Sequence, residues 1–289
     1  MFGAIPFPDW LDPVIVEVGP LALRWYGLAY IVGWGLALYY ALRTVARPEL
    51  FAPAKPARGA ARVPGRKTLE DFAFWILLGV IIGGRIGSVL LYQPGKYLDD
   101  PLAVFRMWEG GMSFHGGLLG VAATILLFAR IKRFEVLRLS DLAAIGTPIG
   151  LGLWRVTNFI NQELWGHPTD LPWGVVFDTG GPFARHPSQL YEAALEGLVL
   201  FLVLWWLTRR RGILAKPGIA TGVFIAGYGC FRMFVELFRV PDAELILGVS
   251  RGTAYSLPMV IVGGALAVWA ARRWPVEPVF EPEPEPAPA

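Results

Sequence analysis

Seven long apolar segments are the feature that most constrains how this chain can fold. A helix needs about 20 consecutive apolar residues to cross the hydrocarbon core of a bilayer. Of the 289 residues, 55% are hydrophobic and only 17% are charged, whereas soluble domains usually carry about 25% charged residues. The sequence therefore predicts an all-α polytopic membrane protein with about seven transmembrane helices. The expected spans are 21–43, 69–92, 114–130, 139–160, 189–208, 218–238 and 253–272.

Basic residues are distributed unevenly between the connecting segments. Sixteen Lys and Arg residues follow the odd-numbered spans, and five lie in the alternate segments. Cytoplasmic loops are enriched in Lys and Arg, so we expect a periplasmic N-terminus and a cytoplasmic C-terminus. The basic segments are 44–68, 130–138, 209–216 and 272–273.

The chain is expected to form one transmembrane domain, residues 1–275, followed by a disordered cytoplasmic tail, residues 276–289. The tail is rich in alternating Glu and Pro and has few apolar residues to bury. The stretch Pro53–Gly65, rich in Pro, Ala and Arg, is predicted to be a flexible basic loop.

Polar side chains recur near the ends of the apolar segments, and the predicted topology brings them to one level near the outer leaflet. A charged residue in hydrocarbon costs at least about 2.5–3.5 kcal/mol on insertion scales. Such a repeated cost indicates a polar site at that depth. The residues are Arg24, Tyr26, Arg85, His115, Arg155, Asn158, Gln189, Glu192, Glu196, Tyr228, Arg232, Glu236 and Arg239.

The spacing within the sixth span supports an inward-facing polar set. Tyr228, Arg232, Glu236 and Arg239 share one helix face. One interpretation is that Arg–Glu pairs only hold helices together and cancel each other's charge. The other is that the arginines outnumber their carboxylate partners and bind an anion. Because guanidinium groups fit phosphate in a bidentate geometry, a phospholipid headgroup is the expected anion.

Glycines are dense in two of the spans, at Gly83–Gly87 and next to His115. Close helix packing through small residues is the simpler interpretation. For the His115 segment, backbone amides near a helix start could also approach an anion.

Other functional classes are weaker candidates. A transporter or flippase for an anionic lipid would use intramembrane arginines equally well, but no internal repeat is visible. A passive membrane scaffold would not need the arginines. The sequence contains no zinc-protease, P-loop or serine-hydrolase motif, and the net charge of +3, placed in loops, is not typical of nucleic-acid binding.

At these same residues the chain closely resembles the prolipoprotein diacylglyceryl transferases. The resemblance runs over most of the chain. It departs from the family pattern at Trp154 and Thr157, which replace glycines, and at Thr253, which replaces a glutamine. The matching segments are Arg24–Gly27, Gly83–Gly87, Gly110–Gly117, Arg155–Gly166, Arg185–Glu192, Tyr228–Glu236, Phe238–Arg239, Pro241–Asp242 and Ser256–Met259.

The resemblance implies an enzyme of the bacterial cytoplasmic (inner) membrane that carries out the first step of lipoprotein maturation. The donor would be phosphatidylglycerol and the acceptor the lipobox cysteine thiol of a prolipoprotein. The products would be a thioether-linked lipoprotein and glycerol phosphate. No metal or organic cofactor is expected, no nucleic acid is expected as a partner, and the chain is expected to act as a monomer among membrane lipids.

Within this reaction, His115, Arg155 and Arg232 are the expected catalytic residues. Arg155 and Arg232 would bind the phosphate, and Asn158 would orient the headgroup. His115 would be the general base, or would only hydrogen-bond the lipid while the arginines lower the pKa of the thiol. The other expected substrate-binding residues are Tyr26, Arg85, Glu163, Tyr228, Glu236 and Arg239, of which Glu163 and Glu236 would mainly orient arginines.

Overall fold

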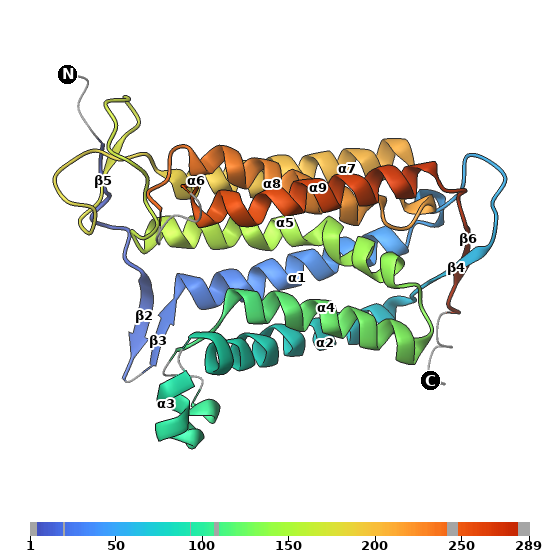
Figure 1. Cartoon of the computed structure of the whole chain (residues 1–289), viewed down its shortest axis with the longest axis horizontal. Helices are drawn as coiled ribbons and strands as arrows, with labels where there is room; N and C mark the ends of the chain where they lie inside the picture. The colour runs from blue at the N-terminus through green and yellow to red at the C-terminus, as the bar shows by residue number, and fades with distance from the viewer. Residues whose placement is uncertain (1–4, 20, 93, 107–109, 242–247, 283–289) are drawn as a thin grey trace. The chain divides into compact units, whose positions relative to one another are not determined.

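Seven helices in the computed structural model are long and apolar enough to cross a membrane (Figure 1), which confirms the predicted fold class. The structure describes residues 5–19, 21–92, 94–106, 110–241 and 248–282, so Asp242 and tail residues 283–289 lie outside the described residues. Six of the spans contain α1 Trp25–Val45, α2 Arg66–Gly87, α4 Phe114–Lys132, α5 Val136–Ile160, α8 Ile219–Glu236 and α9 Arg251–Arg272.

The helix bounds agree with the expected spans to within a few residues, apart from the first. Residues 21–24, expected to begin that span, instead form strand β3 Leu21–Arg24. This strand pairs antiparallel with β2 Val14–Val18. The β-branched residues of β2 favour a strand, and its pairing overrides the helical preference of Leu21–Arg24.

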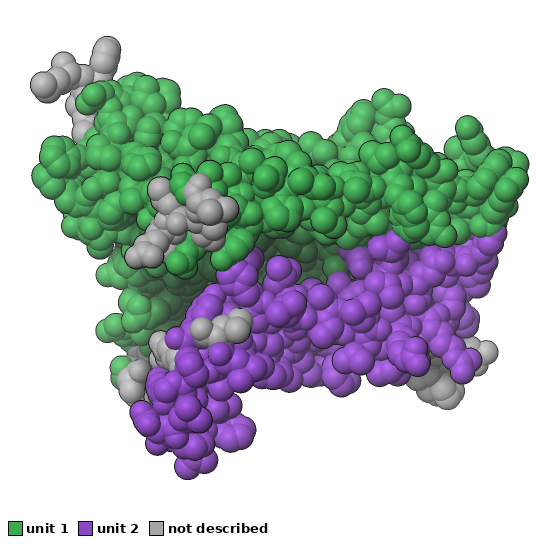
Figure 2. All heavy atoms as spheres, in the orientation of Figure 1, with its two compact units in different colours: residues 1–58, 141–276 green, residues 59–140, 277–289 purple. Residues whose placement is uncertain are grey.

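The chain divides into two compact units, each described here by itself (Figure 2). Unit 1 comprises residues 1–58 and 141–276, and unit 2 comprises residues 59–140 and 277–289. The boundary falls near the start of α5, so the remaining turns of this helix belong to unit 1.

In unit 1, α8 and α9 lie side by side at very close range. A Cβ atom added at Gly222 would lie 2.5 Å from the backbone nitrogen of Ala267, and one added at Gly263 would lie 2.5 Å from that of Ala226. Small residues at both positions let the two backbones approach, as is usual for membrane helices. This packing fixes the helix that carries Arg232 and Glu236.

Unit 1 also contains an extramembrane layer. Strand β1 Ile5–Pro6 pairs parallel with β5 Val175–Val176, and Phe7, Val175 and Phe177 form a small buried apolar cluster beside them.

Two short 3₁₀ helices also belong to unit 1. The helix η1 Pro48–Leu50 follows α1, and η6 Ile213–Ala215 precedes α8.

The fifth span is interrupted in its hydrogen-bond pattern. It consists of α6 Ser188–Glu192, the π-helical segment η5 Ala193–Val199 and α7 Leu200–Arg211. Short π-helical segments inside α-helices are frequent at functional sites. Here the irregular segment directly follows Glu192 and contains Glu196.

In unit 2, the glycines noted in the sequence pack α2 against α4. A Cβ atom added at Gly116 would overlap the carbonyl oxygen of Gly83 and lie 2.8 Å from the Cα atom of Gly87. The structure thus confirms the close-packing interpretation of these glycines. The same unit contains the π-helical segment η2 Ser88–Tyr92, α3 Pro94–Asp99 and η3 Pro101–Phe105.

Two segments expected to be irregular instead pair with each other. Strand β4 Ala60–Val63 lies within the predicted flexible loop, and strand β6 Glu277–Phe280 lies within the predicted disordered tail. The two run parallel. Just after β6, Glu281 forms a 2.7 Å ion pair with Arg62 and accepts a 3.0 Å hydrogen bond from the backbone nitrogen of Gly65. The expectation of disorder is therefore wrong for residues 277–280, because Val279 and Phe280 can form a strand once a partner is present.

Candidate functional site

A buried carboxylate, Glu192, connects three arginines of unit 1. Its Oε1 atom accepts hydrogen bonds from Nη1 of Arg232 at 2.9 Å and from Nη1 of Arg239 at 2.8 Å. Its Oε2 atom lies 3.1 Å from Nη1 of Arg155. The Glu192 side chain is fully buried, and those of Arg155 and Arg232 are each 11% exposed. Glu192 therefore fixes the relative positions of arginines that come from α5, from α8 and from the residues after α8.

Two further carboxylates complete this network. Oε2 of Glu196 lies 3.3 Å from both Nε and Nη2 of Arg155. Oε2 of Glu236 lies 2.7 Å from Nη2 of Arg232, one helical turn earlier on α8. The Tyr228 side chain lies close enough to Arg155 and Arg232 to interact with them electrostatically. Arg232 and Glu236 therefore pair along α8, whereas Arg239, expected on the same helix face, lies beyond the end of this helix.

The charge balance of this network differs from the sequence expectation. Three arginines meet three glutamates, so the expected surplus of arginine over carboxylate is wrong for this cluster. The reason is that Glu192 and Glu196 both turn toward Arg155. An anion must therefore bind through unused N–H groups rather than through unpaired positive charge. A guanidinium has five N–H donors; Arg155 uses Nε, Nη1 and Nη2 here, and Arg232 uses Nη1 and Nη2.

A second group of polar side chains lies at the outer ends of α1 and α5, as judged from the predicted topology. The Tyr26 hydroxyl donates to Oε1 of Glu163, and Nδ2 of Asn158 donates to the same oxygen at 2.6 Å. Asn158 Nδ2 also donates to the Tyr26 hydroxyl. Burial raises the pKa of the Glu163 carboxyl, and the positive charge of Arg239 opposes this. Tyr26, Asn158 and Glu163 are thus brought together, although Glu163 was expected mainly to orient arginines.

Gln189 and His186 support the residues that surround this group. Nε2 of Gln189 donates to the carbonyl oxygen of Glu163 at 2.5 Å. Nδ1 of His186 lies 3.1 Å from the hydroxyl of Tyr191, and burial together with the charge of His167 lowers the pKa of His186. The bond from Gln189, together with the 2.9 Å bond from Oγ of Ser188 to the carbonyl oxygen of Leu164, holds the segment 163–166 against the start of the fifth span.

His115 lies in unit 2, at the start of α4. Its Nδ1 atom lies 2.9 Å from the hydroxyl of Tyr92, and its side chain is exposed. The backbone nitrogen of Gly116 donates to Oγ of Ser113 at 3.1 Å, and that of Gly117 to the carbonyl oxygen of Ser113 at 2.9 Å. These two amides are already bonded, so they do not form the anion site that the sequence left open.

Arg85, also in unit 2, has partners that the sequence did not predict. Its buried guanidinium donates to backbone carbonyl oxygens of the segment that connects α2 to α4. The acceptors belong to Ala103, Val104, Arg106, Gly110 and Gly111. In the structure, Arg85 therefore holds this segment in place; its expected contact with a substrate stays a prediction.

The sequence did not show how central Glu192, Glu196 and Gln189 are. Their spacing marked one helix face, but periodicity cannot tell which carboxylate bridges several arginines. Among the described residues, no group of three or more His, Cys, Asp or Glu side chains is placed to hold a metal ion.

This arrangement of buried arginines, glutamates, Tyr26 and Asn158 can be compared with known proteins. The family model for prolipoprotein diacylglyceryl transferase matches residues 13–269. The chain belongs to the prolipoprotein diacylglyceryl transferase family. All of the unit 1 site residues named above lie inside the matched range, as do Arg85 and His115.

Individual relatives match over nearly their whole length. The chain is 49% identical over 273 residues to the phosphatidylglycerol–prolipoprotein diacylglyceryl transferase of Sinorhizobium medicae. The aligned region covers 93% of this chain and 94% of the relative. The protein of the same name from Mesorhizobium japonicum is 47% identical over 289 residues, covering 98% and 96%. That from Pseudoalteromonas atlantica is 49% identical over 275 residues, covering 92% and 91%.

Proposed function

We propose that this chain is an enzyme that transfers a diacylglyceryl group from phosphatidylglycerol to a prolipoprotein, the first step of lipoprotein maturation. The observation that carries this proposal is the family match, which covers both units and every candidate site residue. The near full-length relatives all bear the name of this activity.

The proposed acceptor is the lipobox cysteine of the signal peptide. Its thiolate attacks the terminal glyceryl carbon of the lipid that bears the phosphate oxygen. The C–S bond forms as the C–O bond breaks, and glycerol phosphate leaves with the bonding electron pair. The products are a thioether and glycerol phosphate, so no oxidant or reductant is required.

In this proposal, Arg155 and Arg232 hold the phosphate. The leaving group gains negative charge in the transition state, and fixed cations beside it lower the barrier. Glu192 bonds both arginines, and the N–H donors left over on each remain for the lipid oxygens. Arg239 and Glu236 keep these guanidiniums oriented through their ion pairs.

Tyr26, Asn158 and Glu163 are proposed to orient the glycerol headgroup, because their linked oxygens and amide offer both donors and acceptors. Tyr228 would line the same site. His115 is proposed as the base that takes the thiol proton, since its imidazole is exposed and histidine is the side chain that most often transfers protons in enzymes. Arg85 is proposed to act through the loop that it holds.

We further propose a bacterial cytoplasmic membrane location, with the N-terminus in the periplasm and the C-terminus in the cytoplasm. The basic segments after the odd-numbered spans support this orientation. We expect the chain to act as a monomer and without a cofactor.

The test uses purified full-length protein in detergent, a lipobox peptide and phosphatidylglycerol. Mass spectrometry should show a diacylglyceryl mass added to the peptide cysteine, and none on a Cys→Ser peptide. A protein that moves the lipid but leaves the peptide unmodified would overturn the proposal and favour a transporter.

The residue roles are tested in the same assay. Arg155→Ala and Arg232→Ala should each lose about 10²–10³ in rate, and His115→Gln should shift the pH profile as well as lower the rate. Arg66→Ala removes an arginine that is largely exposed and is the matched control. Wild-type rates in the Arg155 and Arg232 variants would remove their phosphate role, and a wild-type pH profile in His115→Gln would remove the base.

A further inference from the structure

A second basic site lies in unit 1, at the C-terminal ends of α1 and α7. A cavity of about 350 Å³ opens between these helices, within the lower range of pockets that bind small molecules. Three arginines line it: Arg43 and Arg47 from α1 and the residues just after it, and Arg209 from α7. Among the described residues, none of those that line the cavity is acidic.

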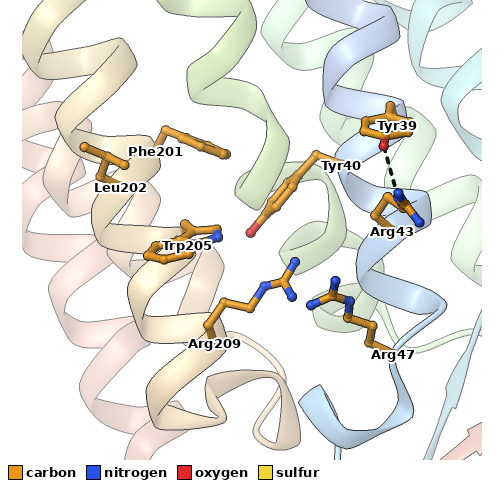
Figure 3. Close-up of a pocket in the computed structure, with 8 residues that line it drawn as sticks. All are labelled: Tyr39, Tyr40, Arg43, Arg47, Phe201, Leu202, Trp205 and Arg209. Atoms are coloured by element: carbon orange, nitrogen blue, oxygen red, sulfur yellow. Dashed lines mark hydrogen bonds between the residues drawn. The ribbon is translucent and has the colours of Figure 1, made fainter.

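The charged groups of this cavity face one another. Figure 3 shows the guanidiniums of Arg47 and Arg209 pointing toward the same space, with the Tyr40 hydroxyl directed into it. Nε of Arg209 and the hydroxyl of Tyr40 are buried and have no hydrogen-bond partner among the described residues. Arg43 donates to the Tyr39 hydroxyl at 3.0 Å, at the edge of the cavity. Like charges directed at one space repel each other, and a bound anion would reduce this repulsion and accept hydrogen bonds from the guanidiniums.

The walls of the cavity are apolar and partly open. Phe201 stacks edge-on against Tyr40, with ring centroids 5.2 Å apart. Leu202 and Trp205 also line the cavity, and they are 47% and 40% exposed. On a membrane-spanning helix, such side chains face lipid tails. An acyl chain could therefore lie along α7 while its phosphate reaches the arginines.

This cavity is separate from the site of the proposed reaction. Tyr40 follows Tyr26 by fourteen residues on α1, which is about 21 Å at 1.5 Å per residue. Arg209 is likewise nearly four helical turns beyond Glu196 in the fifth span. The two sites lie toward opposite ends of the same spanning helices, and so toward opposite faces of the membrane.

We propose that this cavity binds the phosphate of an anionic glycerophospholipid from the leaflet opposite the reacting lipid. Basic pockets between membrane helices on the cytoplasmic side are suited to anionic headgroups. The guanidinium groups of the three arginines recognise phosphate oxygens, and the apolar wall of α7 favours a lipid over a free phosphate ion. The choice of leaflet rests on the proposed function, whereas the binding of a lipid phosphate in this cavity does not.

The test compares two charge-matched variants of the full chain. The pocket variant carries Arg43→Gln, Arg47→Gln and Arg209→Gln. The control variant carries Arg210→Gln, Arg272→Gln and Arg273→Gln, which removes the same charge from exposed positions at the ends of α7 and α9. Both variants lose equal non-specific attraction to an anionic surface.

Binding is measured on delipidated protein in detergent by native mass spectrometry with added phosphatidylglycerol. We expect the pocket variant to bind one phosphatidylglycerol fewer per chain than the wild type and the control variant, because the lipid of this cavity should bind at least tenfold more weakly. Phosphatidylethanolamine should occupy this cavity less than phosphatidylglycerol does. Competition with millimolar inorganic phosphate distinguishes a lipid ligand from a free phosphate ion. Displacement of the lipid from this cavity would show that the free ion binds equally well and would overturn the choice of a lipid. No displacement would support the lipid as the ligand.

Equal lipid binding by the wild type and the pocket variant would overturn the proposal. So would an equal loss in both variants, because that result would mean general surface charge. If the pocket variant does not fold, Arg47→Gln alone is measured, since this side chain is exposed and its removal leaves the helix packing intact. The pocket variant should retain transferase activity in detergent, which separates failure at this site from failure of the proposed function.

Discussion

Replacing Glu192 with glutamine tests the central ion network most directly. The substitution keeps the size of the side chain but removes a negative charge shared by Arg155, Arg232 and Arg239. It would leave three buried cations facing two carboxylates. Breaking a buried ion pair by removing one partner usually costs about 3–5 kcal/mol, because an uncompensated charge stays buried. At 1.4 kcal/mol per factor of ten, this corresponds to a loss of about 10²–10³ or more in the ratio of folded to unfolded protein.

The matched control is Glu70→Gln. Glu70 pairs with Arg66 at 2.9 Å on α2, but the two side chains are 43% and 76% exposed. Such a pair contributes about 0.3–0.5 kcal/mol. Unfolding by denaturant in detergent should therefore separate the two variants by several kcal/mol, even though each removes one glutamate charge.

A double variant distinguishes charge balance from loss of contacts. Glu192→Gln combined with Arg239→Gln restores equal numbers of cations and carboxylates. Neutral replacement of both partners is much less costly than removal of one, so the double variant should be more stable than Glu192→Gln alone. A Glu192→Gln protein no less stable than Glu70→Gln, or a double variant with additive losses, would refute this reasoning.

Three further outcomes are expected. Gly116→Val should destabilise unit 2 by at least about 2 kcal/mol, because the added Cβ atom would overlap the carbonyl oxygen of Gly83. Gly117→Ala should change stability little, because its added Cβ atom would lie 3.7 Å from the nearest atom outside its own helix. Thermal unfolding of both variants checks this. Folding lowers the pKa of His186, so the unfolded chain binds this proton more tightly than the folded chain does. Stability should therefore fall as the pH drops below about 6.5. In His186→Asn, the free energy of unfolding should depend less on pH between about pH 5 and 8. Asp141→Ala should cost about 3 kcal/mol in urea unfolding, because its buried carboxylate accepts hydrogen bonds of 2.6–2.8 Å from the start of α8; stability equal to wild type would remove this capping role.

The membrane helices could be predicted because their signal is strong and local. Lipid excludes any spanning structure that leaves backbone groups unpaired, so a long apolar run already implies a helix. The polar face of α8 was also predictable, since Arg232 and Glu236 differ by one helical turn. The short pairing of β4 with β6 was not, because each strand gains its hydrogen bonds only from a segment far away in the sequence.

The site was predictable in its membership and less so in its bonding. Tyr26, Asn158 and Glu163 were all predicted site residues, but the bonds of Glu163 to Tyr26 and Asn158, rather than to an arginine, were not predicted. The partner of each arginine depends on side-chain directions in the π-helical segment, which no periodicity in the sequence reveals. Arg85 illustrates the same limit, because a buried arginine that binds backbone carbonyls leaves no pattern of matching acidic residues.

The pairing of β4 with β6 also dictates the order in which the molecule can assemble. Ala60 is made more than two hundred residues before its partner Glu277. At about 5–20 residues per second of synthesis, the first strand waits roughly ten to forty seconds for the second. The membrane helices between them are translated during that interval, so this junction closes last, and a chain truncated just before residue 277 would leave the ribosome with its early strand still unpaired.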